Sequence, residues 1–228
     1  FWVNTPDLMS STNAIQLQKG VGTSTNGSGA FGASLGLSTL GAGEKGGRIT
    51  LGAGSYGTQR ATMEASTGKS ASGFWMNTRI SSITSDGYVE RASSDLQSYY
   101  VSAGFAGGGH YVEAVRFGGG ERTYQAWYGL DPQQLEEDRR QNPYTYENEV
   151  DDYKQNHYQL HWNEKLNNHW STNLGLNYTK GAGFFEQYKA EEDAADFNNL
   201  IEDGSDVIVR RWLDNNFYVL NFNANYKT

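Results

Sequence analysis

Three glycines near the N-terminus have the spacing of a phosphate-binding motif. Gly27, Gly29 and Gly32 form the pattern G-x-G-x-x-G, which cradles a pyrophosphate where a strand leads into a helix. After Gly32, however, Leu35 and Leu37 alternate with small residues at the period of a strand. We expect no helix there, so the sequence does not predict a nucleotide site.

Other residues with metal-binding chemistry are also better explained without a ligand. His157 and His161 lie four residues apart, a separation of about 13 Å along a strand, whereas zinc binds nitrogen at about 2 Å. We favour the interpretation that both histidines lie in the wall of a β-barrel or at the base of a loop. A group of carboxylates could bind a cation but is more typical of a solvated loop: Glu147, Glu149, Asp151 and Asp152. We predict no metal site, no cofactor and no catalytic residue, because no Ser, His and acid set recurs.

The composition favours an all-β chain. Among 228 residues there are 28 Gly, 15 Tyr, 10 Phe and 6 Trp, but no Cys, which excludes disulfides and a thiol nucleophile. The net charge of −8 argues against a nucleic-acid partner. No run approaches the roughly 18 apolar residues of a membrane-spanning helix, but a transmembrane barrel strand needs only about 9 to 11 alternating residues.

Alternation of apolar and polar residues dominates the chain from Arg48 onward. Eight runs have the period of a strand: 48–53, 60–67, 74–83, 96–105, 110–117, 157–162, 169–179 and 217–226. We predict that one face meets lipid through Ile49, Leu51, Leu160, Leu174, Leu176, Leu220 and Phe222. The other face lines a lumen with polar residues, including Glu64, Asn173 and Asn221.

Short and long connections alternate between these strands, apart from a short first one. Long loops are expected at 118–156 and 180–216, with a helix from Asp131-Pro132 through about Arg140 and a second over 190–201. Short turns at one end and long loops at the other are typical of an outer-membrane barrel. The alternative is a soluble β-sandwich or β-solenoid adhesin, in which the apolar face packs on a second sheet.

Residues 15–39, IQLQKGVGTSTNGSGAFGASLGLST, resemble the end of the plug domain of a TonB-dependent outer-membrane receptor. The family pattern K-G-x(6-8)-G-x-G-A-x-G is matched by Lys19-Gly20, Gly27, Gly29-Ala30 and Gly32. Further segments resemble barrel strands and loops of Bacteroidetes-type members: RITLGAGSYGTQRATMEASTG, RISSITSDGYVERASSD, TYQAWYG, NPYTYENEVDDYKQNHYQLHW and GAGFFEQYK. The glycines Gly20, Gly27, Gly29 and Gly32 would then serve a tight backbone path inside the lumen.

The resemblance implies a domain organisation. Residues 1–46 would be the C-terminal part of the plug, and 47–228 the first eight strands of a barrel that closes with about 22 strands. The family's signal peptide, energy-coupling box and remaining strands are not in this sequence, so we expect a fragment spanning the end of the plug and the first barrel strands.

The resemblance also implies a function, in the outer membrane of a Gram-negative cell. Such a receptor binds an external metal chelate, vitamin or oligosaccharide and imports it with energy from TonB. Its partners would be outer-membrane lipid, the external ligand and the TonB complex, which engages the N-terminal part of the receptor. The resemblance also allows a surface lipoprotein as a partner. The rival hypotheses are a structural or adhesive barrel without transport and, less favoured, a membrane-embedded enzyme.

The two long loops concentrate aromatic residues. Exposed aromatics favour recognition, because they offer large contact area at small entropic cost. We predict that the ligand contacts nine of these residues: Tyr124, Trp127, Tyr128, Tyr144, Tyr146, Phe184, Phe185, Tyr188 and Trp212. The alternative is that these side chains pack on one another and so keep the loops ordered.

Overall fold

The structure is a computed structural model that describes residues 5–20 and 32–228. Its main body is one antiparallel sheet in which eight strands pair in chain order. They are β3 (Gly46–Ala53), β4 (Gln59–Ser66), β5 (Phe74–Ser85), β6 (Ser94–Gly107), β7 (His110–Tyr124), β8 (Val150–Lys165), β9 (Trp170–Glu192) and β10 (Ser205–Tyr226). The predicted all-β antiparallel fold, with eight strands in its main sheet, is confirmed.

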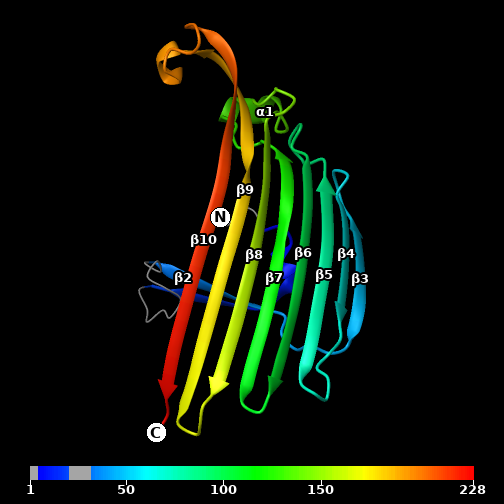
Figure 1. Cartoon of the computed structure of the whole chain (residues 1–228). Coiled ribbons are helices and arrows are strands. Elements are labelled where there is room, and N and C mark those ends of the chain that lie inside the picture. The colour runs from blue at the N-terminus through cyan, green and yellow to red at the C-terminus, as the bar shows by residue number, and fades with distance from the viewer. Residues whose placement is uncertain (1–4, 21–31) are drawn as a thin grey trace.

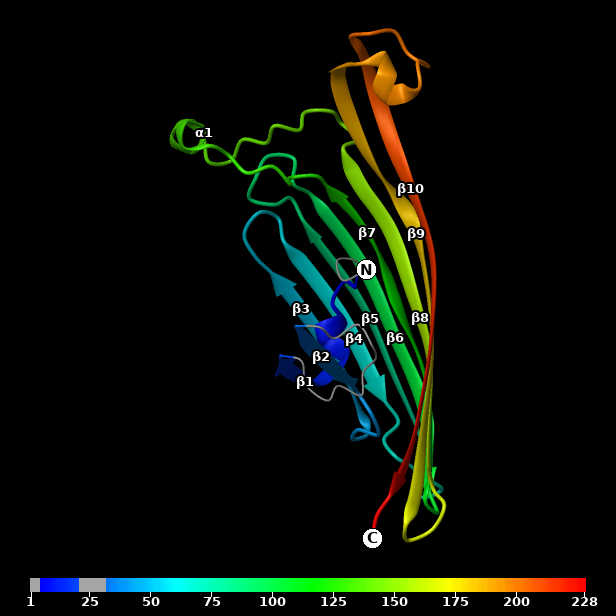
Figure 2. The ribbon, with the colours of Figure 1, turned by 90° about the vertical axis from the view of Figure 1, so that its left-hand side faces the viewer.

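A smaller two-stranded sheet lies inside the curve of the large one (Figure 2). The 3₁₀-helix η1 (Leu8–Ser11) leads into β1 (Thr12–Lys19), which pairs with β2 (Ala33–Thr39). Gly20, at a φ of 87°, donates its N–H to the carbonyl of Gly32 over 2.7 Å and so continues this ladder. The strand after Gly32 confirms that no Rossmann-type helix follows. Gly27 and Gly29 lie outside the described residues.

The connections differ in length between the two ends of the sheet (Figure 1). Those at one end are short, at 67–73, 108–109 and 166–169. The end that carries α1 (Pro132–Glu137) holds the connections 54–58, 86–93, 125–149 and 193–204. The two-residue turn is Gly108-Gly109, with φ of 61° and 90°, values that glycine adopts without strain. The predicted separation of short turns from long loops is confirmed.

The small sheet and η1 identify the inner face of the wall. From this face Arg79 contacts Ser11, and Tyr100 and Phe117 contact Leu8 and Leu40. Their sequence neighbours point outward because side chains alternate along a strand. Strand register then places the residues predicted to face lipid on the outer face and those predicted to face the lumen on the inner face.

The predicted bounds of both long loops are wrong. β7 and β8 pair as far as Tyr124 and Val150, which confines the first loop to 125–149. β9 and β10 already pair at Glu192 and Ser205, which leaves a loop of only 193–204. Beyond Phe185 the β9–β10 hairpin continues without β8. Its sequence has no apolar stripe there, so strand periodicity could not reveal it.

The predicted helices are shorter than expected. Asp131 caps α1 by accepting a hydrogen bond from the amide of Gln134, as its position before Pro132 suggests, but the helix ends at Glu137. The second predicted helix is reduced to the 3₁₀ turn η2 (Ala194–Phe197). No helix in the described ranges has the length and apolar character needed to cross a membrane.

Candidate functional site

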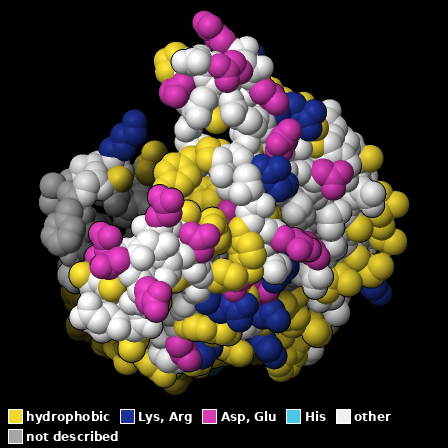
Figure 3. Space-filling view, turned by 90° about the horizontal axis from the view of Figure 1, so that it is seen from above, with side chains coloured by type: hydrophobic (Ala, Val, Ile, Leu, Met, Phe, Trp, Pro, Cys, Tyr) yellow, Lys and Arg dark blue, Asp and Glu magenta, His cyan; other side chains and the backbone are white. Residues whose placement is uncertain are grey.

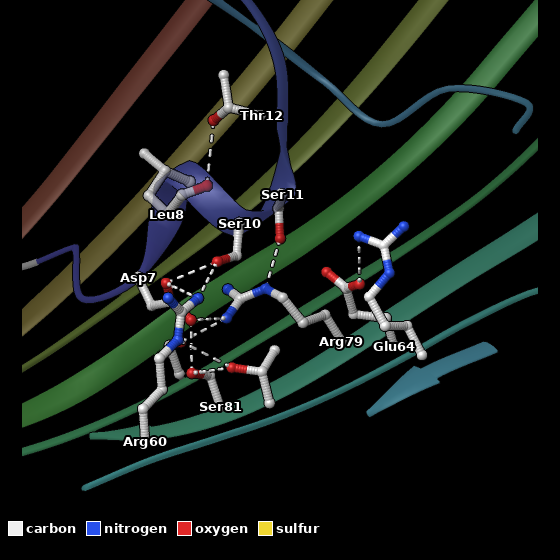
Figure 4. A network of polar contacts seen from close by, with 12 residues as sticks. Asp7, Leu8, Ser10, Ser11, Thr12, Arg60, Glu64, Arg79 and Ser81 are labelled. Atoms are coloured by element: carbon white, nitrogen blue, oxygen red, sulfur yellow. Dashed lines mark hydrogen bonds and ion pairs between the residues drawn. The ribbon is translucent and has the colours of Figure 1, made fainter. Parts of the chain in front are cut away.

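The clearest built site is a polar contact between η1 and the inner face of the wall (Figure 4). Asp7 precedes η1 with a φ of 52°, a conformation that Asp tolerates better than most residues. Its Oδ1 accepts hydrogen bonds from Arg60 (3.0 Å) and Ser10 (2.7 Å). Its Oδ2 accepts from Arg79 (3.2 Å) and Ser81 (2.5 Å). One carboxylate therefore joins the N-terminal segment to β4 and β5.

Arg79 is the most deeply placed member of this contact. Its side chain is 2% exposed, and that of Asp7 is 8% exposed. Its Nε donates to Ser11 Oγ over 2.6 Å, and its Nη1 donates to Ser98 Oγ over 2.9 Å. A buried charge of this kind is tolerated only when it is paired and hydrogen-bonded. We call Asp7, Ser10, Ser11, Arg60 and Arg79 the polar anchor.

Apolar and backbone contacts hold the same segment beside the polar anchor. Leu8 and Leu40 pack against Tyr100, Val115 and Phe117. The Tyr100 hydroxyl donates to the carbonyl of Leu40 over 3.0 Å.

The wall also makes close contacts with Pro6, at the start of the segment, and with Gly41, after β2. A Cβ at Gly119 would lie 2.8 Å from Pro6, so the wall approaches the segment closely at a residue without a side chain. Asn77 Nδ2 donates to the carbonyl of Gly41 over 2.8 Å. The contacts described here between the segment and the wall are hydrogen bonds, ion pairs and apolar packing.

The histidine and acidic candidates do not form a metal centre. His157 stacks on Phe117, with ring centroids 4.4 Å apart, and bonds Thr179 through Nδ1 over 2.9 Å; His161 contacts Gln159 instead. Both histidines lie on the inner wall, as predicted. The described residues contain no group of three metal-ligating side chains.

The carboxylates of the acidic run at 147–152 lie in different surroundings. Asp151 and Asp152 follow one another on β8 and so point to opposite faces. Glu149 is buried in the loop, where it accepts the amide of Tyr188 over 3.2 Å. Burial raises the pKa of its carboxyl above the ordinary value. The run is therefore not one solvated cluster, and Glu149 helps to hold the loop against the hairpin.

Most of the predicted ligand-binding aromatics pack in pairs. Ring centroids are 6.0 Å apart in Trp127–Phe185, 5.1 Å in Tyr128–Tyr144, 6.3 Å in Tyr146–Tyr188 and 4.9 Å in Phe184–Trp212. The remaining residue, Tyr124, donates its hydroxyl to the carbonyl of Tyr146 over 2.6 Å. Five of the predicted residues lie on strands rather than in a loop: Tyr124, Phe184, Phe185, Tyr188 and Trp212. Strand register puts Phe184 and Trp212 on the outer face and Phe185 on the inner face.

Exposure separates these aromatics into two groups. Trp127, Tyr128 and Trp212 are 56%, 66% and 68% exposed, whereas Tyr144 is 9% exposed. Tyr146 donates to Glu186 and Tyr188 to Asp206, so their hydroxyls are already used. Only the first group has large free surface with which to meet a ligand. Acidic side chains are spread over this end of the molecule (Figure 3).

Sequence reasoning missed the residues that hold these parts together. Gln125 is fully buried and donates to the carbonyls of Val150 and Glu186. Arg79 could have been noticed, because it stands between Asn77 and Ser81 on a face that is otherwise uncharged along β5. Asp7 gives no such signal, since it lies 72 residues away from Arg79 in the chain.

Comparison with known proteins rests on structure. No protein-family model and no curated protein sequence matches the chain. The ferric-catecholate import receptor Fiu from E. coli K12 aligns with 95% of this chain in its open form, with a TM-score of 0.74 and 11% identity, and with 89% in its closed form, with a TM-score of 0.65 and 11% identity. The siderophore receptor PiuA from Acinetobacter baumannii aligns with 84%, with a TM-score of 0.67 and 12% identity.

These alignments cover 36%, 31% and 29% of the respective receptors, so the chain spans about a third of their length. At this identity the likeness concerns the fold. It agrees with the resemblance seen in the sequence and excludes a two-sheet sandwich for the eight-stranded sheet, which forms one curved wall. The chain has the fold of part of a TonB-dependent receptor, with eight barrel strands curving around a small inner sheet.

Proposed function

We propose that this chain is part of an outer-membrane receptor that binds an external ligand and imports it with energy from TonB. The observation that carries the proposal is that residues 5–20 and 32–40 lie inside the wall, with the start of this segment held by the polar anchor. A structural or adhesive barrel has no need of a chain segment in its lumen. Polar contacts also suit a segment that must detach, because water can replace each of them.

In this proposal residues 1–46 are the end of the plug, and residues 47–228 are barrel wall. TonB acts on a part of the receptor outside this chain, and a surface lipoprotein is a further partner that the family resemblance allows. The chain itself makes and breaks no covalent bonds. Its work is binding and gating.

Ligand capture belongs to the end of the sheet that carries α1. Trp127 and Tyr128 are the contacts that we propose, because they lie in the loop and combine aromatic surface with exposure, whereas the exposed ring of Trp212 lies on the outer face. The remaining predicted aromatics would act as scaffold. The acidic surroundings favour a neutral or cationic ligand over an anionic chelate. A metal chelate without net negative charge, a vitamin or an oligosaccharide would suit them.

Energy-dependent uptake tests this function. Cells that produce the full-length protein would be given a radiolabelled ferric catecholate, cobalamin or a maltooligosaccharide as probes. We expect one neutral probe to accumulate above the level of deletion cells, and a protonophore to abolish the difference. Equal accumulation in both strains for every probe, or uptake that survives the protonophore, would favour the structural or adhesive alternative.

A further inference from the structure

A chain of uncharged hydrogen-bonding side chains runs along the inner face of β8 and β9. Strand register places His157 opposite Thr179 and Gln159 opposite Asn177. Thr179 Oγ1 lies 2.9 Å from His157 Nδ1 and accepts a hydrogen bond from Asn177 Nδ2 over 3.2 Å. Gln159 Nε2 donates to Asn177 Oδ1 over 3.2 Å, and Gln159 Oε1 lies 3.4 Å from His161 Nε2. We call His157, Gln159, His161, Asn177 and Thr179 the inner polar stripe.

The inner polar stripe keeps donors that no described residue uses. Gln155 Nε2 lies 2.8 Å from His157 Nε2. Because an amide nitrogen only donates, the His157 ring carries its hydrogen on Nδ1 and donates it to Thr179. Thr179 Oγ1 therefore accepts two hydrogen bonds, and its own hydroxyl hydrogen is left over. Gln159 and Asn177 each donate one of two amide hydrogens within the stripe, and the second hydrogen of each bonds no described residue.

An exposed aromatic ring stands beside these donors. Phe217 on β10 pairs with Thr179, which extends the row that His157 begins. The ring belongs to the inner face, because its neighbour Tyr218 stacks on Tyr178 at the outer face. It is 60% exposed. The inner face of β8–β10 thus combines a flat apolar surface with hydrogen-bond donors at its edge, which is the composition of a small-molecule site.

This part of the inner face carries no acidic or basic residue. The inward positions at 157–163 on β8, 173–179 on β9 and 215–223 on β10 hold only Asn, Gln, His, Thr, Gly, Phe and Val. The inner face of β4 and β5 differs, because Arg60 and Arg79 bind the N-terminal segment there through ion pairs. An ion that entered the neutral region would lose hydration without gaining a counter-charge. The region therefore favours a neutral ligand.

We propose that the inner polar stripe and Phe217 bind a neutral polyhydroxylated molecule, a saccharide, on its way through the lumen. Hydroxyl groups both donate and accept, so they match amide, hydroxyl and imidazole groups that lie side by side. The C–H face of a sugar ring would cover Phe217. A polypeptide is the poorer match, because the segment that this wall binds uses ion pairs and leucine packing, which the stripe does not offer. The inference rests on the proposed function and narrows it to one ligand class.

Saccharide uptake by matched inner and outer variants tests the site. Cells that produce the full-length protein would be given radiolabelled maltohexaose, cellohexaose, xylohexaose or mannohexaose, with a ferric catecholate as the charged comparison. We expect at least one hexasaccharide to accumulate. At a subsaturating concentration, Phe217→Ala should lower its uptake rate about tenfold, the effect of one aromatic contact. Thr179→Val should lower the rate about fivefold, the effect of one neutral hydrogen bond. Phe222→Ala and Thr172→Val remove a ring of 61% exposure and a hydroxyl from the outer face, and should leave the rate unchanged.

Several outcomes would overturn the site. They are equal rates in inner and outer variants, and accumulation of the ferric catecholate without any hexasaccharide. Heat-modifiable migration is measured first. If Phe217→Ala does not assemble, that ring packs against the plug, and Thr179→Val decides, because it keeps the volume of the side chain. If no probe enters the cells, the proposed function itself fails. If a hexasaccharide enters and Phe217→Ala and Thr179→Val behave like their controls, only the saccharide site is wrong.

Discussion

At the scale of single residues, Asp7 and Arg79 form the most deeply buried contact between the inner segment and the wall. Asp7→Asn leaves the buried Arg79 guanidinium without a counter-charge, and loss of one partner of a buried pair costs about 3–5 kcal/mol. We expect the segment 5–19 to detach more often, and a protease to cut it faster in the purified full-length protein. Arg60→Gln is the matched control, because Arg60 is 39% exposed and its ion pair is worth about 1 kcal/mol or less. Equal protection in Asp7→Asn and the unaltered protein would remove the polar anchor as a holding device.

A second residue prediction concerns pH. Burial raises the pKa of Glu149 in the folded loop above its unfolded value, so the folded loop binds the proton more tightly. The stabilisation from this group is complete below the ordinary glutamate pKa and is lost as the pH rises through the raised value. Hydrogen exchange at the Tyr188 amide, corrected for intrinsic rates, should show easier opening at higher pH. Glu149→Gln should flatten that dependence, and an unchanged slope in this variant would assign it to another group.

At the scale of elements, the two faces of one strand should differ in what they tolerate. Leu174 lies on the outer face of β9 beside Trp162 and Phe222, and Asn173 lies on the inner face beside Asn163 and Asn223. Leu174→Arg should cost about 2–4 kcal/mol in unfolding free energy if it stands near the bilayer midplane, and Asn173→Arg far less. Urea unfolding of the full-length protein from vesicles measures both. Equal costs would mean that the outer face is not in lipid.

The aromatic residues of the loop and the hairpin make a separate prediction. Trp127→Ala and Tyr128→Ala should lower uptake of whichever probe the receptor imports, with normal assembly and heat-modifiable migration, because both rings lie in the loop and are mostly exposed. Tyr144→Ala removes a buried ring and should weaken the packing of the loop first. If Trp127→Ala and Tyr128→Ala fail to assemble, or import normally, these rings are scaffold and the proposed capture site is wrong.

Elements embedded in the wall were predictable because burial and alternation coincide in them. β5 has Trp75, Asn77 and Arg79 inward and Phe74 and Met76 outward, at a strict period of two. The part of the β9–β10 hairpin beyond Phe185 was missed because it pairs with no third strand and therefore needs no apolar face. The polar anchor was missed because no local pattern connects Asp7 to residues more than fifty positions away.

At the scale of the whole molecule, the proposed transport requires the inner segment to leave the wall, and a reversible cross-link can prevent that movement. Asp7→Cys and Ser81→Cys replace two side chains whose oxygens lie 2.5 Å apart, in a chain without other cysteines. Oxidation to a disulfide, or bridging with a short bis-methanethiosulfonate reagent, which forms a disulfide with each thiol as sulfinate leaves, would fix the segment to β5 in whole cells.

We expect the bridged double variant to bind the imported probe at the cell surface without accumulating it. A reductant should restore accumulation to the level of the two single-cysteine variants, which control for loss of the polar anchor itself. If the bridged protein, with its cross-link verified, imports the probe as fast as its reduced form, the segment does not need to move. That result would contradict the proposed gating role of the segment inside this wall.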